Sequence, residues 1–283
     1  SFQCAWLLNY YPAEWMAAFL DKEPEHKKEK AIGIAKSLGF KTAPLDVNTS
    51  GKVWEISGDG KTLIQPLTSI KGLGDSAMDQ ILEHRPFKKV EDFLFHEFIT
   101  YSKLNKKALD VLCRAGALKS LQDERFTGAK HFWSAIACDR PRKLKDLAVN
   151  IAAYKEEGDF STAERIQYLT DLTGIFPINL VMKDKTLSDL NDAGVPPISE
   201  YDPELKAVWF IPRKVNVRKT KNDKSYYVIE AVDLNNMITQ IRCWGANPER
   251  DHIQINRPYV ATLQYNDQWG FSTRSIYHNL RPL

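Results

Sequence analysis

Cysteine is scarce in this chain of 283 residues, and its spacing is irregular. The four cysteines (Cys4, Cys113, Cys138 and Cys243) lie far apart and form no CxxC pair, and the six histidines are equally scattered. Zinc sites and disulfide frameworks of small domains need closely spaced ligands or paired cysteines, so neither class is indicated. We therefore expect no metal site, and reduced, mostly buried thiols in a cytoplasmic protein.

Long apolar runs are also missing. No stretch of the chain approaches the roughly 20 apolar residues that cross a bilayer, and no secretory signal opens it. A membrane partner is therefore not expected.

The residue patterns of common catalytic sites are absent as well. No Asp-x-Asp pair occurs, so adjacent strand positions cannot build the two-carboxylate metal clamp of nucleotidyl transfer. Gly60-Lys61-Thr62 resembles the end of a phosphate-binding P-loop, but Glu55 stands where its first glycine is required. We predict a chain that binds rather than catalyses, with no catalytic residue and no cofactor of its own.

Positive charge is present but unevenly distributed. The net charge is only +3, yet residues 103–145 contain eleven Lys or Arg against four Asp or Glu. Residues 206–283 contain twelve against six, so the remainder is acidic. Such segregation favours basic faces for a polyanion, although solvated helix faces would give the same counts.

The most informative motif is the segment Thr68–Met78, in which Lys71-Gly72-Leu73-Gly74 precedes a new helix. Two glycines permit a tight turn with positive φ. The amides of this turn and of the following helix then form an anion site, to which Lys71 adds charge. The pattern is typical of a helix-hairpin-helix that grips duplex DNA, and an ordinary tight turn between helices is the alternative.

The periodicity divides the chain into a helical part and a part rich in strands. Residues 1–40 are predicted to be helical, with Glu25–Leu38 ending at Gly39, and residues 41–68 to form short strands and turns. Further helices are expected over Asp75–His84, Val90–Phe98, Leu104–Ala115 and Thr162–Leu172. A helical, basic connector is expected from about Thr127 to Tyr154, and Pro196, Pro197 and Pro203 indicate a linker.

Five strand-like segments follow the linker: Ala207–Val217, Ser225–Val232, Met237–Trp244, Tyr259–Tyr265 and Trp269–Ile276. Their number, their β-branched and aromatic residues and the basic first turn predict an OB-fold barrel. An SH3-like barrel or a five-stranded meander is the structural alternative. The fold class is thus α+β and multidomain.

The predicted barrel contains basic and aromatic residues of the kind that hold single-stranded DNA. A charged groove with stacking platforms is how OB-folds bind single strands. Alternation along a strand must place part of the aromatic set (Trp209, Phe210, Tyr226, Tyr227, Trp244, Trp269 and Phe271) in the core. The candidate single-strand site consists of Arg213, Arg218, Lys219, Lys221, Lys224, Tyr226, Arg242 and Trp244.

Several motifs, in order, resemble the bacterial replicative DNA polymerase III alpha subunit. They are Phe2–Leu7 with Tyr11–Ala18, Pro44–Ser50, Ile70–Gly74, Leu104–Leu118 and Thr173–Pro177. In that family they belong to the late fingers, a tandem helix-hairpin-helix and the approach to an OB domain. The resemblance covers almost the whole chain and implies a C-terminal portion, in a short form suited to a phage-encoded polymerase.

The resemblance implies four regions and a set of partners. The regions are the end of the fingers (1–67), the tandem helix-hairpin-helix (68–122), a helical connector and linker (123–203) and the OB domain (204–283). Duplex phosphates would be held by Lys71, Gly72, Leu73, Gly74, Lys106 and Lys107. The implied partners are primer–template DNA, single-stranded template and an upstream polymerase half whose palm holds the catalytic aspartates and Mg²⁺. By itself this chain is expected to be inactive.

Other features depart from the family pattern or leave alternatives open. The sliding clamp is a further implied partner, but the nearest match to its binding peptide, Glu157–Phe160, lacks the usual Gln. Ser1 and the apolar residues Phe2, Trp6 and Leu8 indicate a fragment or one half of a split protein. A stand-alone nucleic-acid adaptor and a protein-binding OB barrel are the alternative functions.

Overall fold

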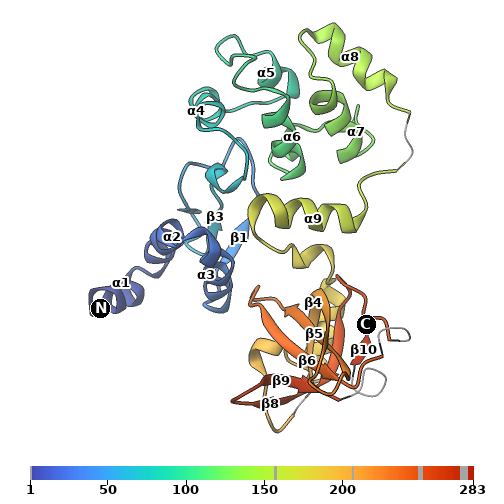
Figure 1. The fold of residues 1–283 in the computed structure, drawn as a ribbon. Coiled ribbons are helices and arrows are strands. Elements are labelled where there is room, and N and C mark those ends of the chain that lie inside the picture. The colour runs from blue at the N-terminus through green and yellow to red at the C-terminus, as the bar shows by residue number, and fades with distance from the viewer. Residues whose placement is uncertain (1, 156–157, 206, 248–250, 275–279) are drawn as a thin grey trace. The chain divides into compact units, whose positions relative to one another are not determined.

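The computed structural model describes residues 2–155, 158–205, 207–247, 251–274 and 280–283. It divides into two compact units, which we describe in turn (Figure 1). The first contains residues 1–31 and 38–176, and the second contains residues 32–37 and 177–283. The first is mainly helical and the second is mainly sheet, which confirms the predicted α+β class. No helix of the described residues has both the length and the apolar character needed to cross a membrane.

The N-terminal region contains the predicted helices and short strands. Three helices, α1 (Phe2–Tyr10), α2 (Pro12–Lys22) and α3 (Glu25–Ser37), precede Gly39, whose φ of +88° ends the third one. A small sheet follows in the order β1-β3-β2; its strands are β1 (Lys41–Ala43), β2 (Glu55–Ile56) and β3 (Thr62–Ile64). Each strand is only two or three residues long, as the many turn residues between them dictate.

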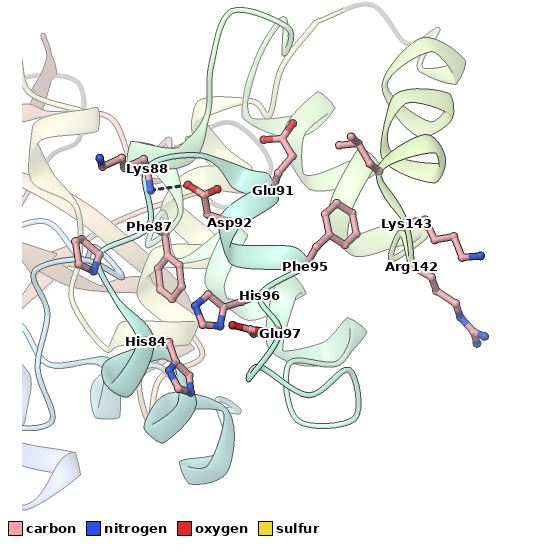
Figure 2. Close-up of a pocket in the computed structure, with 12 residues that line it drawn as sticks. His84, Phe87, Lys88, Glu91, Asp92, Phe95, His96, Glu97, Arg142 and Lys143 are labelled. Carbon is pink, nitrogen blue, oxygen red and sulfur yellow. Dashed lines mark hydrogen bonds between the residues drawn. The ribbon is translucent and has the colours of Figure 1, made fainter.

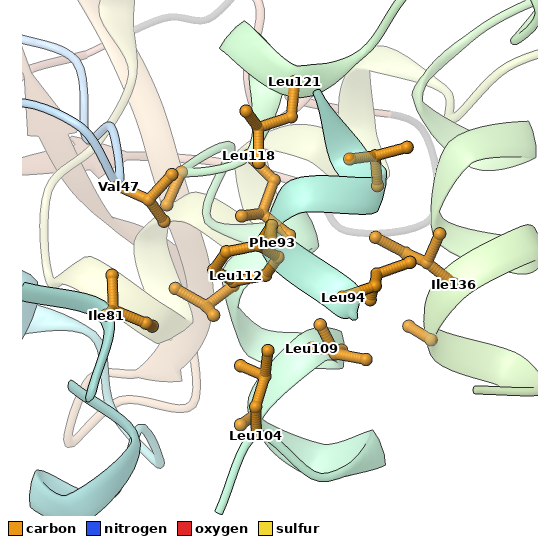
Figure 3. Packing of buried hydrophobic residues seen from close by; sticks show 14 of the residues in the cluster. Val47, Ile81, Phe93, Leu94, Leu104, Leu109, Leu112, Leu118, Leu121 and Ile136 are labelled. Carbon is orange, nitrogen blue, oxygen red and sulfur yellow. The ribbon is translucent and has the colours of Figure 1, made fainter. Parts of the chain in front are cut away.

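The core of the first unit lies among α4 (Asp75–His84), α5 (Val90–Leu94) and α6 (Lys106–Arg114). Figure 3 shows Phe93 at its centre, surrounded by leucines of α6 and the segments beside it. The helix predicted over Val90–Phe98 ends four residues early. His96 instead stacks on His84 of α4, with 4.8 Å between ring centroids, which turns the chain back toward α4.

The connector is helical, but it is not one continuous helix. It contains α7 (Ala129–Trp133), the π-helical turn η3 (Ser134–Cys138), α8 (Leu144–Ala153) and α9 (Thr162–Thr173). The predicted helical connector from about Thr127 to Tyr154 is interrupted at residues 139–143, where Pro141 cannot donate a helical hydrogen bond. α9 begins with a capping box and ends at Gly174, whose φ is +70°.

The second unit begins with η4 (Ile178–Leu180), α10 (Asp184–Asp192) and η5 (Ile198–Glu200), and continues into a seven-stranded sheet. α10 was not predicted. The sheet order is β10-β7-β4-β5-β6-β9-β8, and of its pairs only β6 with β9 is parallel. The strands are β4 (Ala207–Lys219), β5 (Ser225–Val232), β6 (Thr239–Trp244), β7 (Tyr259–Thr262), β8 (Gln264–Asn266), β9 (Gly270–Thr273) and β10 (Leu280–Pro282).

This sheet curls around its own core. β7 and β8 are separated only by Leu263, yet β7 pairs with β4 and β8 pairs with β9. A nearly continuous strand therefore contacts both ends of the β4-β5-β6-β9 series, and a strand can do so only if the sheet is bent. The result is an OB-like curled sheet, as the sequence predicted.

Three details of the predicted barrel are corrected. The segment Tyr259–Tyr265 is divided in two at Leu263, and β10 adds a strand after the five expected ones. The predicted linker also takes part in the barrel, because the amide of Trp209 donates to the carbonyl of Pro196 at 3.0 Å. Ile276, the predicted end of the last segment, lies outside the described residues.

The central position of Phe93 predicts a large effect of its truncation. Phe93→Ala should lower the free energy of unfolding of the first unit by about 3–5 kcal/mol, because a fully buried phenyl ring is replaced by a cavity. Urea unfolding followed by circular dichroism measures the change. Val149→Ala, at an exposed position of α8, is the control and should stay within about 0.5 kcal/mol of wild type.

Candidate nucleic-acid interface

The hairpin loop Lys71–Gly74 joins η1 (Leu67–Ser69) to α4, and all of its residues except the half-buried Leu73 are exposed. Buried Ile70 anchors it at one end. Gly72 has a φ of +88°, whereas Gly74 has a φ of −77° and a ψ of 145°. The prediction that both glycines adopt positive φ is therefore wrong for Gly74, and only Gly72 needs the left-handed region.

Two hydrogen bonds fix this loop. The amide of Lys71 donates to the carbonyl of Leu172, near the end of α9, at 2.9 Å. The amide of Leu73 donates to the carbonyl of Ile70 at 3.2 Å, which closes the turn around Gly72. The connector thus positions a loop that lies about 100 residues earlier in the sequence, a link that local sequence reasoning has no means of finding.

The loop leads directly into the N-terminus of α4. Gly74 is the N-cap residue and provides no side-chain cap, while its carbonyl accepts from the amides of Ala77 and Met78 at 3.0 and 3.1 Å. The exposed residues Asp75 and Ser76 therefore carry the amides that stand at the positive end of the dipole of this ten-residue helix. Asp75 is the one acidic residue in this turn. Such an end is suited to an anion.

The first two turns of α6 pack against the same loop. A Cβ atom placed on Gly72 would lie 3.6 Å from Cγ1 of Val111 and 3.7 Å from Cε of Lys107. The structure therefore brings Lys107 beside the hairpin, with exposed Lys106 adjacent to it in the chain. This is the grouping of loop and lysines that the resemblance implied.

The lysines stand at an unfavourable end of their helix. Lys106 and Lys107 occupy the first turn of α6, which Asn105 caps by accepting from the amide of Ala108 at 3.0 Å. The helix dipole repels a cation at the helix N-terminus, which destabilises the helix by roughly 0.3–1 kcal/mol for each lysine. A bound phosphate would relieve this repulsion.

On the curled sheet, three candidate residues form one row. Arg218 pairs with Tyr226 and Tyr226 pairs with Trp244, so all three side chains share a face. The rings of Tyr226 and Trp244 lie 4.6 Å apart between centroids. Arg242 lies on the same face one row away, and its Nη1 donates to the carbonyl of Trp269.

The turn between β4 and β5 carries the exposed lysines that were predicted there. Lys219 forms an ion pair with Asp223 at 2.8 Å, and Asp223 adopts a positive φ of 57°. Lys221 and Lys224 project from the same exposed turn. The turn continues the row of Arg218 at the edge of the sheet.

The remaining candidates separate into core and surface. Trp209, Phe210 and Tyr227 are buried, so they are packing residues. Arg213 lies at the register shift between Pro212 and Lys214, outside the row of Arg218. Two further aromatics are exposed. Trp269, 58% exposed, lies in the turn before β9, whereas Tyr265, 55% exposed, pairs with Phe271, whose other partner is the buried Ile241, so Tyr265 lies on the core side of the sheet and not on the face of this row. Tyr265 was not anticipated, since its segment read as one uninterrupted strand.

A pocket of about 840 Å³ lies between the end of α4, α5 and the start of α8, and it is lined by His84, His96 and charges of both signs (Figure 2). No group of three or more described His, Cys, Asp or Glu residues could hold a metal ion.

The thiols follow the expectation only in part. Burial raises the pKa of Cys243 to about 12 and that of Cys113 well above its usual value, so both remain protonated near neutral pH. Cys4 is exposed, however, and Cys113 and Cys138 are half-buried. The expectation of mostly buried thiols therefore holds for Cys243 and for the desolvated thiol of Cys113, and it fails for Cys4.

The segment nearest to a clamp-binding peptide is tied to the protein itself. Both carboxylate oxygens of Asp159 cap α7, accepting from the amides of Lys130 at 2.7 Å and Ala129 at 3.2 Å. Phe160 packs between the rings of Trp133 and Tyr168. Glu157 lies outside the described residues. The described part of this segment is thus engaged within the first unit.

Comparison with known proteins gives consistent matches. Residues 39–128 match the model of the helix-hairpin-helix motif. The DNA polymerase III subunit alpha of Thermus aquaticus is 37% identical over 130 residues, which is 44% of this chain and 10% of the relative. That of Pseudomonas fluorescens is 34% identical over 228 residues, 73% of this chain and 19% of the relative. That of Chlamydia muridarum is 30% identical over 190 residues, 65% of this chain and 13% of the relative.

These matches confirm the resemblance that the motifs carried. The chain is similar to a portion of the DNA polymerase III alpha subunit, and the matched portion is less than one fifth of each of these relatives. The helix-hairpin-helix match contains the loop Lys71–Gly74 and the start of α6.

The two glycines of the loop provide a matched pair of substitutions. Gly72→Ala should destabilise the first unit by about 1–2 kcal/mol, because an alanine at a φ of +88° is strained. Gly74→Ala should cost less, since its φ is ordinary and nothing lies within 4 Å of an added Cβ, so that only the preference for glycine over alanine at an N-cap opposes it. Urea unfolding of both variants measures the difference, and equal losses would contradict the assigned backbone geometry.

Proposed function

We propose that this chain is a DNA-binding part of a replicative DNA polymerase of the polymerase III alpha type. In this role it binds the backbone of primer–template duplex through the hairpin loop and α6, and the single-stranded template through the outer face of the curled sheet. The strongest support is that Lys107 lies beside Gly72. The N-terminus of α4 and the lysines in the first turn of α6 therefore belong to one surface.

Duplex binding is supported by the chemistry of that surface. Backbone amides at a helix N-terminus and lysine ammonium groups recognise phosphate and read no base, as a polymerase that copies any sequence requires. Leu73 is half-buried and packs against the core, so it would position the loop rather than contact DNA. Lys71, Gly72, Gly74, Lys106 and Lys107 are the proposed phosphate contacts.

Single-strand binding is supported by the row Arg218–Tyr226–Trp244 and by its surroundings. Nucleic acids bind OB barrels on the second and third strands and the loops beside them. In this chain those are β5, β6, the lysine turn with Lys219, Lys221 and Lys224, and the turn that presents Trp269. Arg242 links the face to that last turn, whereas Arg213 would add only peripheral charge.

The polymerase reaction itself is assigned to other parts of the enzyme. In the family that the motifs resemble, the catalytic carboxylates and the Mg²⁺ that they hold belong to a palm domain, which would lie outside this chain. We propose the polymerase half that contains this palm as the protein partner. A sliding clamp remains a candidate partner, with no support from the segment around Asp159.

A stand-alone adaptor is the second candidate, and α1 argues against it. This helix buries none of its side chains, and Phe2 is 84% exposed, with Trp6, Leu7 and Tyr10 exposed on the same helix. Such an apolar helix favours a chain that packs against further polypeptide.

For duplex DNA, Lys107→Ala should weaken binding and flatten its salt dependence. Each phosphate contact contributes about 0.9 to the slope of log K against log salt, so the slope should fall by about one. Fluorescence anisotropy of a labelled duplex across a KCl series measures it. Lys61→Ala, an exposed lysine in the turn between β2 and β3, is the control and should match wild type. An affinity that is independent of salt would refute phosphate binding.

For single-stranded DNA, Trp244→Ala should cost about 1–3 kcal/mol of binding free energy, because one stacked base loses its platform. Binding to the duplex should change much less, since a different surface carries it. Anisotropy with labelled oligothymidine measures the effect, and Tyr10→Ala in α1 is the exposed aromatic control. Equal losses for Trp244→Ala on both DNAs would show that the two surfaces are not separate.

A further inference from the structure

The break in the connector holds a buried cation without an acidic partner. Arg140 is only 6% exposed, and among the described residues it forms no ion pair and its Nε has no hydrogen-bond partner. Its guanidinium lies 3.8 Å from the ring centroid of Tyr101, and its Nη1 reaches the carbonyl of the same residue at 3.5 Å. Burial lowers the pKa of Arg140. A buried charge of this kind is costly unless an anion compensates it.

A second arginine meets the same ring. The guanidinium carbon of Arg142 lies 5.3 Å from the ring centroid of Tyr101, and Arg142 itself is exposed. The two arginines thus converge on one aromatic side chain, which is itself exposed. A buried cation and an exposed cation on a shared ring leave an excess of positive potential at that surface.

The segment that carries the arginines is held in place from both sides. Nδ2 of Asn150 donates to the carbonyl of Asp139 at 2.6 Å, and Oδ2 of Asp146 accepts from the amide of Arg142 at 3.2 Å. The π-helical turn η3 directly precedes it, and π-helical turns often occur at functional sites. The carboxylate of Asp146 is directed to backbone amides and leaves the guanidinium groups to another ligand.

The position of Tyr101 ties this cluster to the duplex surface. Tyr101 and Lys103 lie in the turn that runs directly into Lys106 and Lys107 of α6. That turn is fixed on its other side, where the amide of Thr100 donates to Oε1 of Gln80 in α4 at 3.1 Å.

We propose that Tyr101, Arg140 and Arg142 form a further binding site for a backbone phosphate of duplex DNA. Arg142 contacts the phosphate directly at the edge of the ring, while Arg140 positions Tyr101 and supplies uncompensated positive charge from beneath it. The site rests on the proposed duplex binding and extends that surface from the helix-hairpin-helix onto the connector.

Duplex titrations across a KCl series test this site with the full chain. Arg142→Ala and Tyr101→Leu should each weaken binding, and Arg142→Ala should lower the salt slope by about one. Arg281→Ala in β10 is the charge-matched control and should behave as wild type. Arg140→Gln is also measured, but it removes a buried group. Its binding is therefore interpreted only if its melting temperature matches that of wild type; if it does not, Arg142→Ala and Tyr101→Leu decide the outcome.

A duplex scanned with single methylphosphonates identifies the contact. Where the methylphosphonate replaces the phosphate that Arg142 contacts, the affinity of wild type for the duplex should fall, and the affinity of Arg142→Ala should not change.

If Lys107→Ala binds duplex more weakly as expected, while Arg142→Ala binds as wild type does and gives the same scan, this site is wrong and the proposed function stands. If wild type does not bind duplex at all, both fail. Inorganic phosphate could also stabilise the fold of wild type but not that of Arg142→Ala, while the two proteins bind duplex with equal affinity. In that case the ligand of this site is a free phosphate, and the assignment to DNA is overturned.

Discussion

The close approach of Gly72 to α6 is the constraint on which the proposed interface depends. Only a residue without a Cβ adopts the φ of +88° at this point without strain, and the same residue lies against Val111 and Lys107. The bond from the Lys71 amide to the Leu172 carbonyl then fixes the loop against α9. Packing in the core around Phe93 keeps α4 and α6 in the arrangement that this contact requires.

Charge is placed around that contact at a cost to the free protein. Lys106 and Lys107 oppose the dipole of α6, and Arg140 is buried without a carboxylate among the described residues. A fold selected for stability alone would exchange these residues for neutral or acidic ones. A surface that binds phosphates gains from the same placement, because the ligand supplies the missing negative charge.

Local patterns in the sequence predicted much of the fold. The helix Asp75–His84 and the strand Ser225–Val232 have the predicted bounds, because their caps, turns and periodicity agree. Long-range contacts account for what was missed: His96 stacking on His84 shortens α5, and the bend at Leu263 divides a strand. The sequence predicted a positive φ for Gly74 as well as for Gly72, because a Gly-x-Gly pattern does not reveal which of its glycines adopts the left-handed conformation. The pairing of Tyr101 with Arg140 joins two elements about 40 residues apart, and only the structure brings them together.

The central claim is that the amides of Gly72 and Gly74 in the hairpin loop face DNA phosphate, and backbone NMR tests it most directly. The chain contains 14 glycines, so selective ¹⁵N-glycine labelling gives a spectrum simple enough to assign by substitution. On titration with a short duplex, the amide resonances of Gly72 and Gly74 should shift first and furthest, while that of Gly194, after α10, stays in place. Shifts elsewhere with Gly72 and Gly74 unmoved would contradict the account.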